Sequence, residues 1–581
     1  MGGGRLAVIG SIADLLADYR AGHSRPSEVA GEVLDRLGED PGPAWITLVD
    51  PHALRAAARS LDAADPGLPL YGIPFAVKDN IDVGGLPTTA ACPGFAREAD
   101  RDAAVVERLL GAGALLVGKT NMDQFATGLV GTRSPYGTPA CVFDGERVPG
   151  GSSSGSGVAV ALGHVMFALG TDTAGSGRVP AAFNELVGIK PTRGLVSNRG
   201  VLPACRGLDC VSVLARSVAD AAAVLAVAAA FDPADAWSRA PRVPTSPRHG
   251  RVAVPLDGQL IFQEADAAAA WEQACREAAA TWELVRVDIG ALLEAADLLY
   301  DVWVSERTAD LGDIVAAEPD GLDPTVAAIV RAGAGLRAVD VFAGQHRLAE
   351  LHRAACPIWE QADALLLPTT PGHPRLDEVA ADPVGVNARL GRFTNFVNLL
   401  DLAAIAVPGP RRPDGLPGGV SLIAPAFHDH RLMSLAAEWR GEPRPASSGA
   451  TRLVVVGAHM SGLPLNGELT SRGARLVRRA RTAPVYRLFA LPGAGVPRPG
   501  LVRTIHGGAA VEAEVWELAP AAVGELLEGV PAPLGIGRVT LEDGEDAAGF
   551  VCEGYATHGA IDVTSHGGWR AYLDAADMER P

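Results

Sequence analysis

The spacing of apolar residues changes along the chain and divides it into regions that predict different secondary structure. Residues 5–40 have a helical pattern. Between about residues 70 and 215, short apolar runs of the β type (GIPFAVKD, GALLVGKT and ELVGIKPT) alternate with Ala-rich helical segments. Such alternation is typical of α/β proteins whose strands are buried. The pattern therefore predicts an α/β core over this part of the chain.

A similar pattern continues as far as residue 440. The run RVAVPL predicts a strand, and helices are expected between about residues 264 and 365. ADALLLPTTPG, AAIAVPGP and GGVSLIAP each predict a strand that ends in a loop, and RLMSLAAEWR predicts a closing helix. Residues 231–250 are rich in proline, so we expect them to form a surface excursion.

A second domain is expected after a short linker. The segment GEPRPASSGAT is rich in Pro, Ser and Gly, which is typical of linkers. Beyond it, RLVVVGAHMSG, YRLFALPG, AAVEAEVWEL and GRVTLEDGEDAAGFVCEGY are strand-like and separated by turn signals. A chain of 581 residues is long enough for two domains. The sequence therefore predicts a first domain over residues 1–440, a linker over 441–451 and a second domain over 452–581.

The charge balance narrows the range of partners. The chain carries 50 Lys and Arg against 68 Asp and Glu, which gives a formal net charge of -18. This balance argues against a nucleic-acid partner, because binding to phosphates depends on Lys and Arg. It does not exclude a small anionic substrate, since one local Arg can outweigh the field of distant acidic groups.

The cysteines and the apolar runs indicate a reducing, cytoplasmic setting. The seven scattered cysteines include no CxxC pair, so neither a zinc site nor a disulfide framework is expected. No cluster of ligand residues indicates a metal or an organic cofactor, and we expect neither. The longest apolar stretch, residues 158–170, is interrupted by His164 and is shorter than a membrane span. The apolar run at the N-terminus is too short for a signal peptide.

Three motifs carry candidate chemistry. Lys78 ends the apolar run of YGIPFAVKDNID, Ser152 lies in the loop PGGSSSGSGVAVALG, and Ser176 lies in GTDTAGSGRVPAAFNELVGIKPTRG. Taken singly, each has an ordinary explanation, because Gly/Ser loops are usually turns and a Lys near a strand end is usually solvated. Together they resemble the amidase signature family, with supporting matches in GKTNMDQFA, LVGIKPTRG and PTTPG. The resemblance covers residues 5–440 and implies a mixed central sheet wrapped by helices.

The resemblance implies a role for each of these residues. Ser176 would be the nucleophile, Ser152 the bridging serine after a cis peptide to Gly151, and Lys78 the base. A serine hydroxyl needs an adjacent base, and a lysine can serve when burial lowers its pKa. The implied oxyanion hole consists of the backbone N–H groups of Thr173, Ala174, Gly175 and Ser176.

Asp172 and Arg178 flank the implied nucleophile. Two explanations for this pair stay open, namely an ion pair that shapes the loop and a direct part in catalysis. The first is favoured.

Two further segments and the C-terminal region resemble the allophanate hydrolases within this family. NMDQFATGLVGTRSPYG has the form found in these enzymes, and LLYDVWVSERTADL resembles their segment that binds a substrate carboxylate through a Tyr and an Arg. The matching positions are Tyr300 and Arg307. This sequence has one residue fewer between the two, which would turn a continuous helix by about 100°. The alternative, that Tyr300 and Trp303 are core aromatics and Arg307 is a surface residue, stays open.

The resemblance implies hydrolysis of allophanate to ammonia and carbon dioxide. The amidase domain would release ammonia and leave N-carboxycarbamate, and a C-terminal domain containing a γ-glutamylcyclotransferase-like β-barrel would promote its decarboxylation. His459, in VVGAHMSG, would transfer a proton there, although a lone His in such a place is often structural. Four arginines lie close together in one segment, which is either a solvated helix end or a site for the dianionic intermediate. They are Arg475, Arg478, Arg479 and Arg481.

Two other functions stay open. The chain could be an amidase of the same family that acts on another small amide, with the C-terminal domain as a non-catalytic module. It could also be a non-catalytic scaffold built on the amidase fold, although the presence of all three motif residues argues against this. The resemblance also leaves open a homodimer and a functional coupling to a urea carboxylase.

Overall fold

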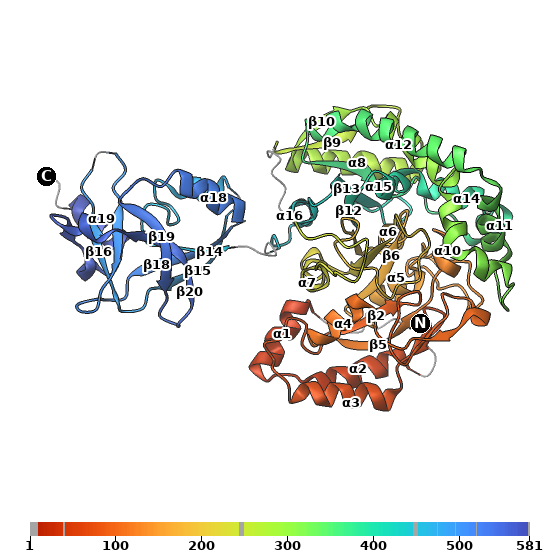
Figure 1. The fold of residues 1–581 in the computed structure, drawn as a ribbon, viewed down its shortest axis with the longest axis horizontal. Helices are drawn as coiled ribbons and strands as arrows, with labels where there is room; N and C mark the ends of the chain where they lie inside the picture. The colour runs from red at the N-terminus through yellow and green to blue at the C-terminus, as the bar shows by residue number, and fades with distance from the viewer. Residues whose placement is uncertain are drawn as a thin grey trace. The chain divides into compact units, whose positions relative to one another are not determined.

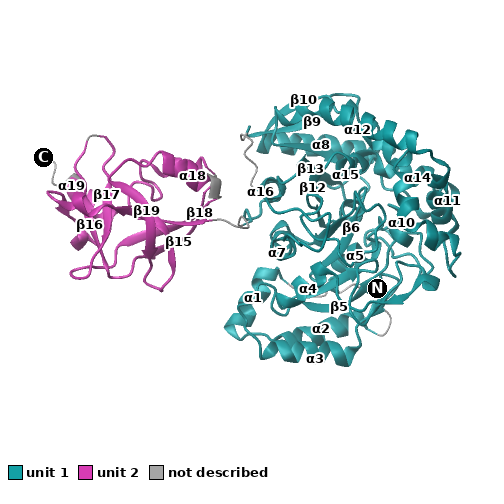
Figure 2. Ribbon diagram, viewed as in Figure 1, with its two compact units in different colours: residues 1–445 teal, residues 446–581 magenta. Residues whose placement is uncertain are grey.

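The computed structural model describes residues 10–38, 41–242, 249–445, 451–472, 474–493, 495–518 and 520–578. The chain forms two compact units, residues 1–445 and residues 446–581, which Figure 2 colours separately. The last helix of the first unit, α16 (Asp429–Arg440), is followed by Gly441, and the first strand of the second unit, β14, begins at Thr451. The predicted linker, residues 441–451, lies across this boundary, and its residues 446–450 lie outside the described part of the chain.

An 11-stranded mixed sheet runs through the first unit, and helices lie on both sides of it (Figure 1). The strand order is β1-β5-β2-β6-β8-β7-β12-β13-β11-β9-β10. Pairing is parallel around β2 and β9 and antiparallel from β6 to β11. This arrangement confirms the predicted fold class. The strands are β1 (Trp45–Leu48), β2 (Pro74–Lys78), β5 (Leu115–Thr120), β6 (Phe167–Asp172), β7 (Val187–Lys190), β8 (Cys210–Ala215), β9 (Arg251–Pro255), β10 (Glu283–Val287), β11 (Ala364–Pro368), β12 (Leu402–Pro408) and β13 (Gly419–Pro425), beside a separate pair β3 (Pro87–Thr88) and β4 (Arg97–Glu98).

Several helices of this unit begin at residues suited to a helix start. Asp50 caps α3 by accepting hydrogen bonds from the N–H groups of His52 and Ala53, and Pro51 occupies the first turn. Asp323 and Pro324 start α11 in the same way. The helices are α1 (Ile12–Ala21), α2 (Pro26–Leu37), α3 (Pro51–Asp62), α4 (Ala104–Gly111), α5 (Ser154–Ala161), α6 (Arg178–Phe183), α7 (Val218–Ala228), α8 (Ala265–Thr281), α9 (Gly290–Asp297), α10 (Val304–Ala316), α11 (Pro324–Ala332), α12 (Ala338–Trp359), α13 (Leu376–Ala381), α14 (Gly385–Leu390), α15 (Asn395–Leu399) and α16.

The central strands are buried on both faces, which explains their continuous apolar sequences. Every residue of β2 (PFAVK) and of β6 (FALGTD) is buried, and the rings of Phe75 and Phe167 stack with their centroids 5.2 Å apart. Because β2 and β6 are parallel neighbours, their carboxyl ends meet at the same edge of the sheet. Lys78 and Asp172, which end these strands, are therefore brought to one place inside the protein.

Three segments can be compared with the predictions made from the pattern. Residues 5–40 contain two helices, α1 and α2, and residues 5–9 and 39–40 lie outside the described residues. The segment expected to be helical between residues 264 and 365 also contains β10, because ELVRV pairs in parallel with β9. Within the Pro-rich excursion, the described residues form neither helix nor strand, and residues 243–248 are not described.

The second unit contains a five-stranded sheet of order β15-β18-β14-β20-β19 and a three-stranded sheet of order β17-β16-β21. The N–H of Ala483 donates to Thr540 and the N–H of Glu542 donates to Arg481, both at 2.9 Å, which joins the two outer strands of the larger sheet. The two edges of the larger sheet thus meet at this end, and the predicted β-barrel stays a prediction. Its likeness to γ-glutamylcyclotransferases stays a prediction. The elements are β14 (Thr451–Val455), α17 (Asn466–Thr470), β15 (Arg475–Arg481), β16 (Tyr486–Ala490), β17 (Pro499–Arg503), β18 (Glu512–Leu518), α18 (Pro520–Glu528), β19 (Leu534–Thr540), β20 (Asp546–Cys552), β21 (Ile561–Asp562) and α19 (Trp569–Met578).

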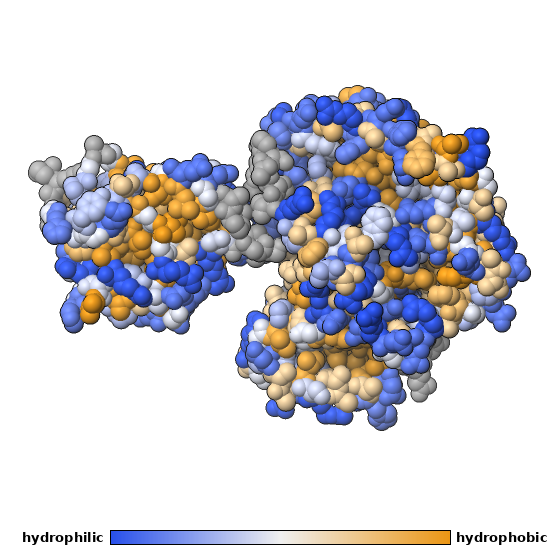
Figure 3. All heavy atoms as spheres, viewed as in Figure 1, coloured by the Kyte–Doolittle hydropathy of each residue, from blue (hydrophilic) through white to orange (hydrophobic). Residues whose placement is uncertain are grey.

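The surfaces of the two units carry both polar and apolar residues. In the face shown in Figure 3, hydrophilic and hydrophobic residues are interspersed over the first unit, and a hydrophobic patch lies on the second. Among the described residues, no helix combines the length and the hydrophobicity that crossing a membrane requires.

Candidate active site

Lys78 and Ser152 form the buried end of the candidate site. Lys78 Nζ lies 2.8 Å from Ser152 Oγ and 2.7 Å from Thr171 Oγ1, and all three side chains are buried. Burial lowers the pKa of Lys78 to about 7, although the carboxylates of Asp123 and Asp209 act in the opposite direction. An amine with this pKa is partly neutral at physiological pH and can accept a proton.

Ser152 and Ser176 lie in neighbouring loops. The peptide between Gly151 and Ser152 is cis, as the family resemblance implied, and Ser152 lies just before α5. Ser176 lies between β6 and α6, and its carbonyl oxygen accepts a hydrogen bond of 3.3 Å from the N–H of Ser153. Within the described residues, no hydrogen bond links the two serine hydroxyls. Such contacts are often long in an enzyme without substrate and shorten when substrate binds.

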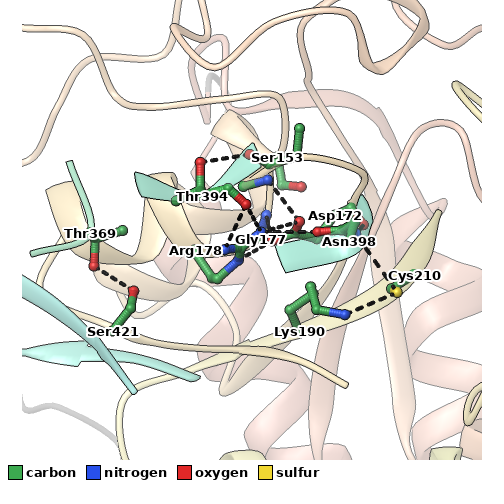
Figure 4. Close-up of polar contacts among 12 residues, drawn as sticks. Ser153, Asp172, Gly177, Arg178, Lys190, Cys210, Thr369, Thr394, Asn398 and Ser421 are labelled. Carbon is green, nitrogen blue, oxygen red and sulfur yellow. Dashed lines mark hydrogen bonds and ion pairs between the residues drawn. The ribbon is translucent and has the colours of Figure 1, made fainter. Parts of the chain in front are cut away.

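A buried ion pair fixes the loop that carries Ser176 (Figure 4). Arg178 donates to both carboxylate oxygens of Asp172 at 2.9 Å, and neither side chain is exposed. Asp172 also accepts hydrogen bonds from the N–H groups of Gly175 (2.8 Å) and Gly177 (3.1 Å). Burial alone favours the neutral acid, but Arg178 holds the pKa of Asp172 below its ordinary value. These contacts are those of an ion pair that shapes the loop, which is the explanation favoured from the sequence.

Residues 394–398 hold the same loop from another side (Figure 4). Thr394 Oγ1 donates to the carbonyl of Ala174 at 2.6 Å, and Asn398 Nδ2 donates to the carbonyl of Asp172 at 2.8 Å. At Gly175 the backbone φ is 131°, and an added Cβ would lie 2.5 Å from Thr394 Oγ1. Only glycine therefore fits at this position without displacing its neighbours.

The loop leaves three of the four implied oxyanion donors available. The N–H of Gly175 is bound to Asp172, so the family-based assignment does not hold at this position. In the described part of the chain, the N–H groups of Thr173, Ala174 and Ser176 have no hydrogen-bond partner. These three residues also line the cavity at Ser176. They are therefore the candidates for stabilising a developing oxyanion.

A cavity opens at Ser176, and Tyr300 and Arg307 both line it. Arg307 Nη1 donates to Thr127 Oγ1 at 2.5 Å, and the Tyr300 hydroxyl accepts a hydrogen bond of 3.4 Å from Asn387 Nδ2. Tyr300 is 44% exposed and is therefore not a core aromatic. The structure thus brings both predicted carboxylate-binding residues to the same cavity as Ser176.

The shortened spacing between Tyr300 and Arg307 does not separate them, because the segment is not one continuous helix. A 3₁₀ turn (Leu298–Tyr300) ends at Tyr300, and Asp301 has φ −92° and ψ −92°. Helix α10 begins only at Val304. The expected rotation of about 100° assumed unbroken helical geometry and is therefore wrong here.

Several residues of this site were not predicted from the sequence. Arg133 and Asn387 line the cavity, and Arg133 lies within the motif NMDQFATGLVGTRSPYG, which is the only signal that points to it. The buried Asp209 accepts a hydrogen bond of 2.5 Å from Thr173 Oγ1, and burial raises the pKa of its carboxyl to about 6. No local pattern marks Asn387 or Asp209, because both reach the site from distant segments.

His459 lies in a pocket of the second unit. Its ring stacks on Phe550 with centroids 4.8 Å apart, and its Nε2 lies 3.1 Å from a carboxylate oxygen of Glu468. Burial lowers the pKa of His459. Apart from His459, Glu468 and Arg498, the lining is mainly apolar, with Leu465 and Leu526 among its residues.

The arginine cluster of the second unit is not a helix end. All four residues lie on β15, and none of them lines the His459 pocket. Arg475 pairs with Glu517, and Arg478 pairs with Asp543, as expected for a solvated face. Arg478, Arg479 and Arg481 line an open hollow of their own together with Glu542 and Asp543, and a site for the dianionic intermediate at this cluster stays a prediction.

The part of the chain that the structure describes contains no group of three or more His, Cys, Asp or Glu residues arranged to hold a metal ion. The candidate chemistry described above comes from side-chain and backbone groups. In the first unit these groups are a buried lysine, two serines from adjacent loops and a set of backbone donors beside a cavity. Together with the mixed sheet, they define a serine hydrolase of the amidase type.

The chain belongs to the amidase family. The family model described as "Amidase" matches residues 28–433, and a second model, "Allophanate hydrolase C-terminal domain", matches residues 451–574. The chain is 41% identical to the urea amidolyase of Saccharomyces cerevisiae over 97% of its own length and 33% of that protein. It is 42% identical to the urea amidolyase of Lachancea kluyveri over 92% of its own length and 32% of that protein.

Solved structures agree with these matches. The allophanate hydrolase of Kluyveromyces lactis superposes with a TM-score of 0.82 at 40% identity, covering 98% of this chain and 100% of that one. The chain thus spans the whole of that solved structure, whereas it spans about a third of the length of the urea amidolyases that it matches.

Proposed function

We propose that the chain hydrolyses allophanate to ammonia and carbon dioxide in two stages, one in each unit. The observation that carries this proposal is the cavity in which Arg307 and Tyr300 lie beside Ser176. Allophanate is a urea that bears a carboxylate, and a guanidinium binds a carboxylate through parallel hydrogen bonds. A site with an amide-cleaving serine at one end and a cation at the other suits this substrate.

In the first stage, Ser176 Oγ attacks the terminal amide carbonyl of allophanate. Its proton passes to Ser152 and from there to Lys78, whose lowered pKa makes the amine a competent base. The N–H groups of Thr173, Ala174 and Ser176 stabilise the oxyanion. The proton then returns through Ser152 to the leaving nitrogen, and ammonia departs. Water hydrolyses the acyl-enzyme by the same route and leaves N-carboxycarbamate.

In the second stage, the His459 pocket promotes decarboxylation of N-carboxycarbamate. A C–N bond breaks, its electron pair stays on nitrogen, carbon dioxide leaves, and His459 transfers a proton to the nitrogen. Glu468 orients the ring, and the apolar walls disfavour a localised carboxylate charge and so favour its loss as neutral carbon dioxide. Arg498 supplies a cation for the carboxylate that remains. The product of this stage is carbamate, which takes up a proton and breaks down in water to the second ammonia and the second carbon dioxide.

Measurement of ammonia and carbon dioxide together tests this proposal. The full chain should release two ammonia per allophanate and should prefer allophanate to acetamide, malonamide and biuret. Ser176→Ala should abolish the release of both products while the protein stays folded. Equal kcat/KM for allophanate and biuret would contradict the assignment of substrate.

A second candidate is an amidase that acts on another small amide, with the C-terminal unit as a non-catalytic module. The similarity of the first unit to subunits of glutamyl-tRNA(Gln) amidotransferases keeps this candidate in view. His459→Gln separates the two: it should slow carbon dioxide release relative to the first ammonia only if the second unit is catalytic.

We also propose that a urea-carboxylating activity supplies the allophanate. The similarity to urea amidolyases over nearly the whole of this chain supports this coupling. A homodimer and a cytoplasmic location stay predictions.

A further inference from the structure

Arg133 is a buried cation at the wall of the Ser176 cavity. It is only 4% exposed, and it lines the cavity together with Tyr300 and Arg307. Its Nη1 donates to the carbonyl of Thr127 at 2.8 Å, and its Nη2 donates to the carbonyl of Pro383 at 2.6 Å. These two bonds fix the plane of the guanidinium and leave its other donors for a further partner.

The charge of Arg133 is not neutralised by an ion pair. In the described part of the chain, no carboxylate forms a salt bridge with its guanidinium, and its buried Nε has no hydrogen-bond partner. The nearby carboxylate of Asp123 instead accepts hydrogen bonds from the backbone N–H groups of Gly131 (2.9 Å) and Arg133 (3.0 Å). A guanidinium stays charged at any physiological pH, and burying it without an anion is costly. Asp123 compensates this charge only in part, from beyond salt-bridge distance, and the guanidinium keeps donors for an anion that enters the cavity.

Thr127 forms hydrogen bonds with both Arg133 and Arg307. Its carbonyl accepts a hydrogen bond from Arg133, and its hydroxyl accepts one from Arg307. Arg307 likewise forms no ion pair with any described residue. Two guanidinium groups that form no salt bridge with any described residue thus lie on either side of one threonine and line one cavity.

We propose that Arg133 is a second substrate-binding cation, which holds the substrate carboxylate together with Arg307 and sets the preference for anionic over neutral amides. The proposal rests on the proposed function and deepens it: the cavity selects acylamino or ureido carboxylates of small size. A neutral amide of the same shape would leave the buried Arg133 and the half-buried Arg307 without a carboxylate partner, and this penalty is the source of the discrimination.

Kinetics with a charged substrate and its neutral analogue test the proposal. Biuret replaces the carboxylate of allophanate by a carboxamide and is otherwise similar in shape. Arg133→Met should raise KM for allophanate at least about tenfold, as expected for a hydrogen bond to a charged group, and should leave kcat/KM for biuret nearly unchanged. Arg133→Lys should recover part of the loss, because it restores the charge without the planar donors. Arg389→Met is the matched control, since this exposed arginine pairs with Asp382 and does not line the cavity.

Binding without turnover provides a second readout. In the Ser176→Ala background, titration calorimetry should show allophanate binding at least about tenfold weaker when Arg133→Met is added, with no loss for Arg389→Met. Equal losses of kcat/KM for allophanate and biuret, or unchanged allophanate binding, would overturn the role of Arg133. A parent enzyme that shows no preference for allophanate over biuret would instead overturn the proposed function.

Discussion

The pH dependence of the amidase step tests whether Lys78 acts as a neutral base. Burial lowers the pKa of its ammonium from 10.5 to about 7, which corresponds to about 5 kcal/mol against the charged form. The neutral fraction then rises from about one tenth at pH 6 to about nine tenths at pH 8. We therefore expect kcat/KM to rise about tenfold over this interval and to level off above it. With an ordinary lysine pKa, the rise would be about a hundredfold and would continue to pH 10.

Initial rates of ammonia release at low substrate concentration, from pH 6 to pH 10, provide the measurement. Acetamide serves as a second substrate, because its hydrolysis requires only the amidase step. His459→Gln is the control, since His459 also has a lowered pKa but lies in the other unit. A log-linear rise to pH 10, a flat profile between pH 6 and pH 8, or a midpoint that moves in the His459 variant would refute the reasoning.

Three further predictions concern Lys78 and the loop that carries Ser176. Lys78→Met should abolish turnover yet raise the free energy of unfolding at pH 7 by a few kcal/mol, measured by urea denaturation, because the native state no longer excludes a proton that the unfolded chain binds. This gain should disappear as the pH approaches 10.5, the value for an unperturbed lysine. Gly175→Ala should lower both kcat and the thermal midpoint, because its Cβ would meet Thr394 Oγ1 at 2.5 Å. Asp172→Asn should cost about 3–5 kcal/mol of unfolding free energy, since it leaves the buried Arg178 unpaired.

For each of these predictions, one result would contradict the physical reason given. A Lys78→Met protein less stable than the parent at pH 7 would show that the contacts of the amine outweigh its desolvation. An unchanged kcat in Gly175→Ala would remove the steric argument. For the buried ion pair, the control is Asp382→Asn, which breaks an exposed pair and should cost less than about 1 kcal/mol. Equal losses in the two Asn variants would show that burial is not decisive.

The fold was predictable where strands carry continuous apolar runs between turn signals, as in β2, β5 and β12. The central strand β6 was not recognised, because its residues continue the apolar stretch that begins in α5 and only a short turn around His164 divides them. Strand β15 was also missed, since RLVRRAR alternates charged and apolar residues weakly and resembles a helix end. In both cases the deciding contacts come from neighbouring strands and not from local sequence.

In the candidate site, too, some features were predictable from the sequence and others were not. Motifs located Lys78, Ser152 and Ser176, because each lies in a short segment with a characteristic sequence. The engagement of the Gly175 N–H by Asp172 could not be read from the motif, since it depends on the exact path of the loop. The lack of an ion-pair partner for Arg133 was equally hidden, because it is a property of all the residues that surround the cavity.

The contacts of residues 394–398 have a consequence for the order in which the enzyme becomes active during synthesis. The loop around Ser176 is anchored by hydrogen bonds to residues 216 to 226 positions later in the chain. A nascent polypeptide that already contains the lysine and both serines still lacks these anchors. Hydrolytic competence should therefore appear abruptly, once the ribosome has released the region around Asn398, and fragments that end before it should be inert.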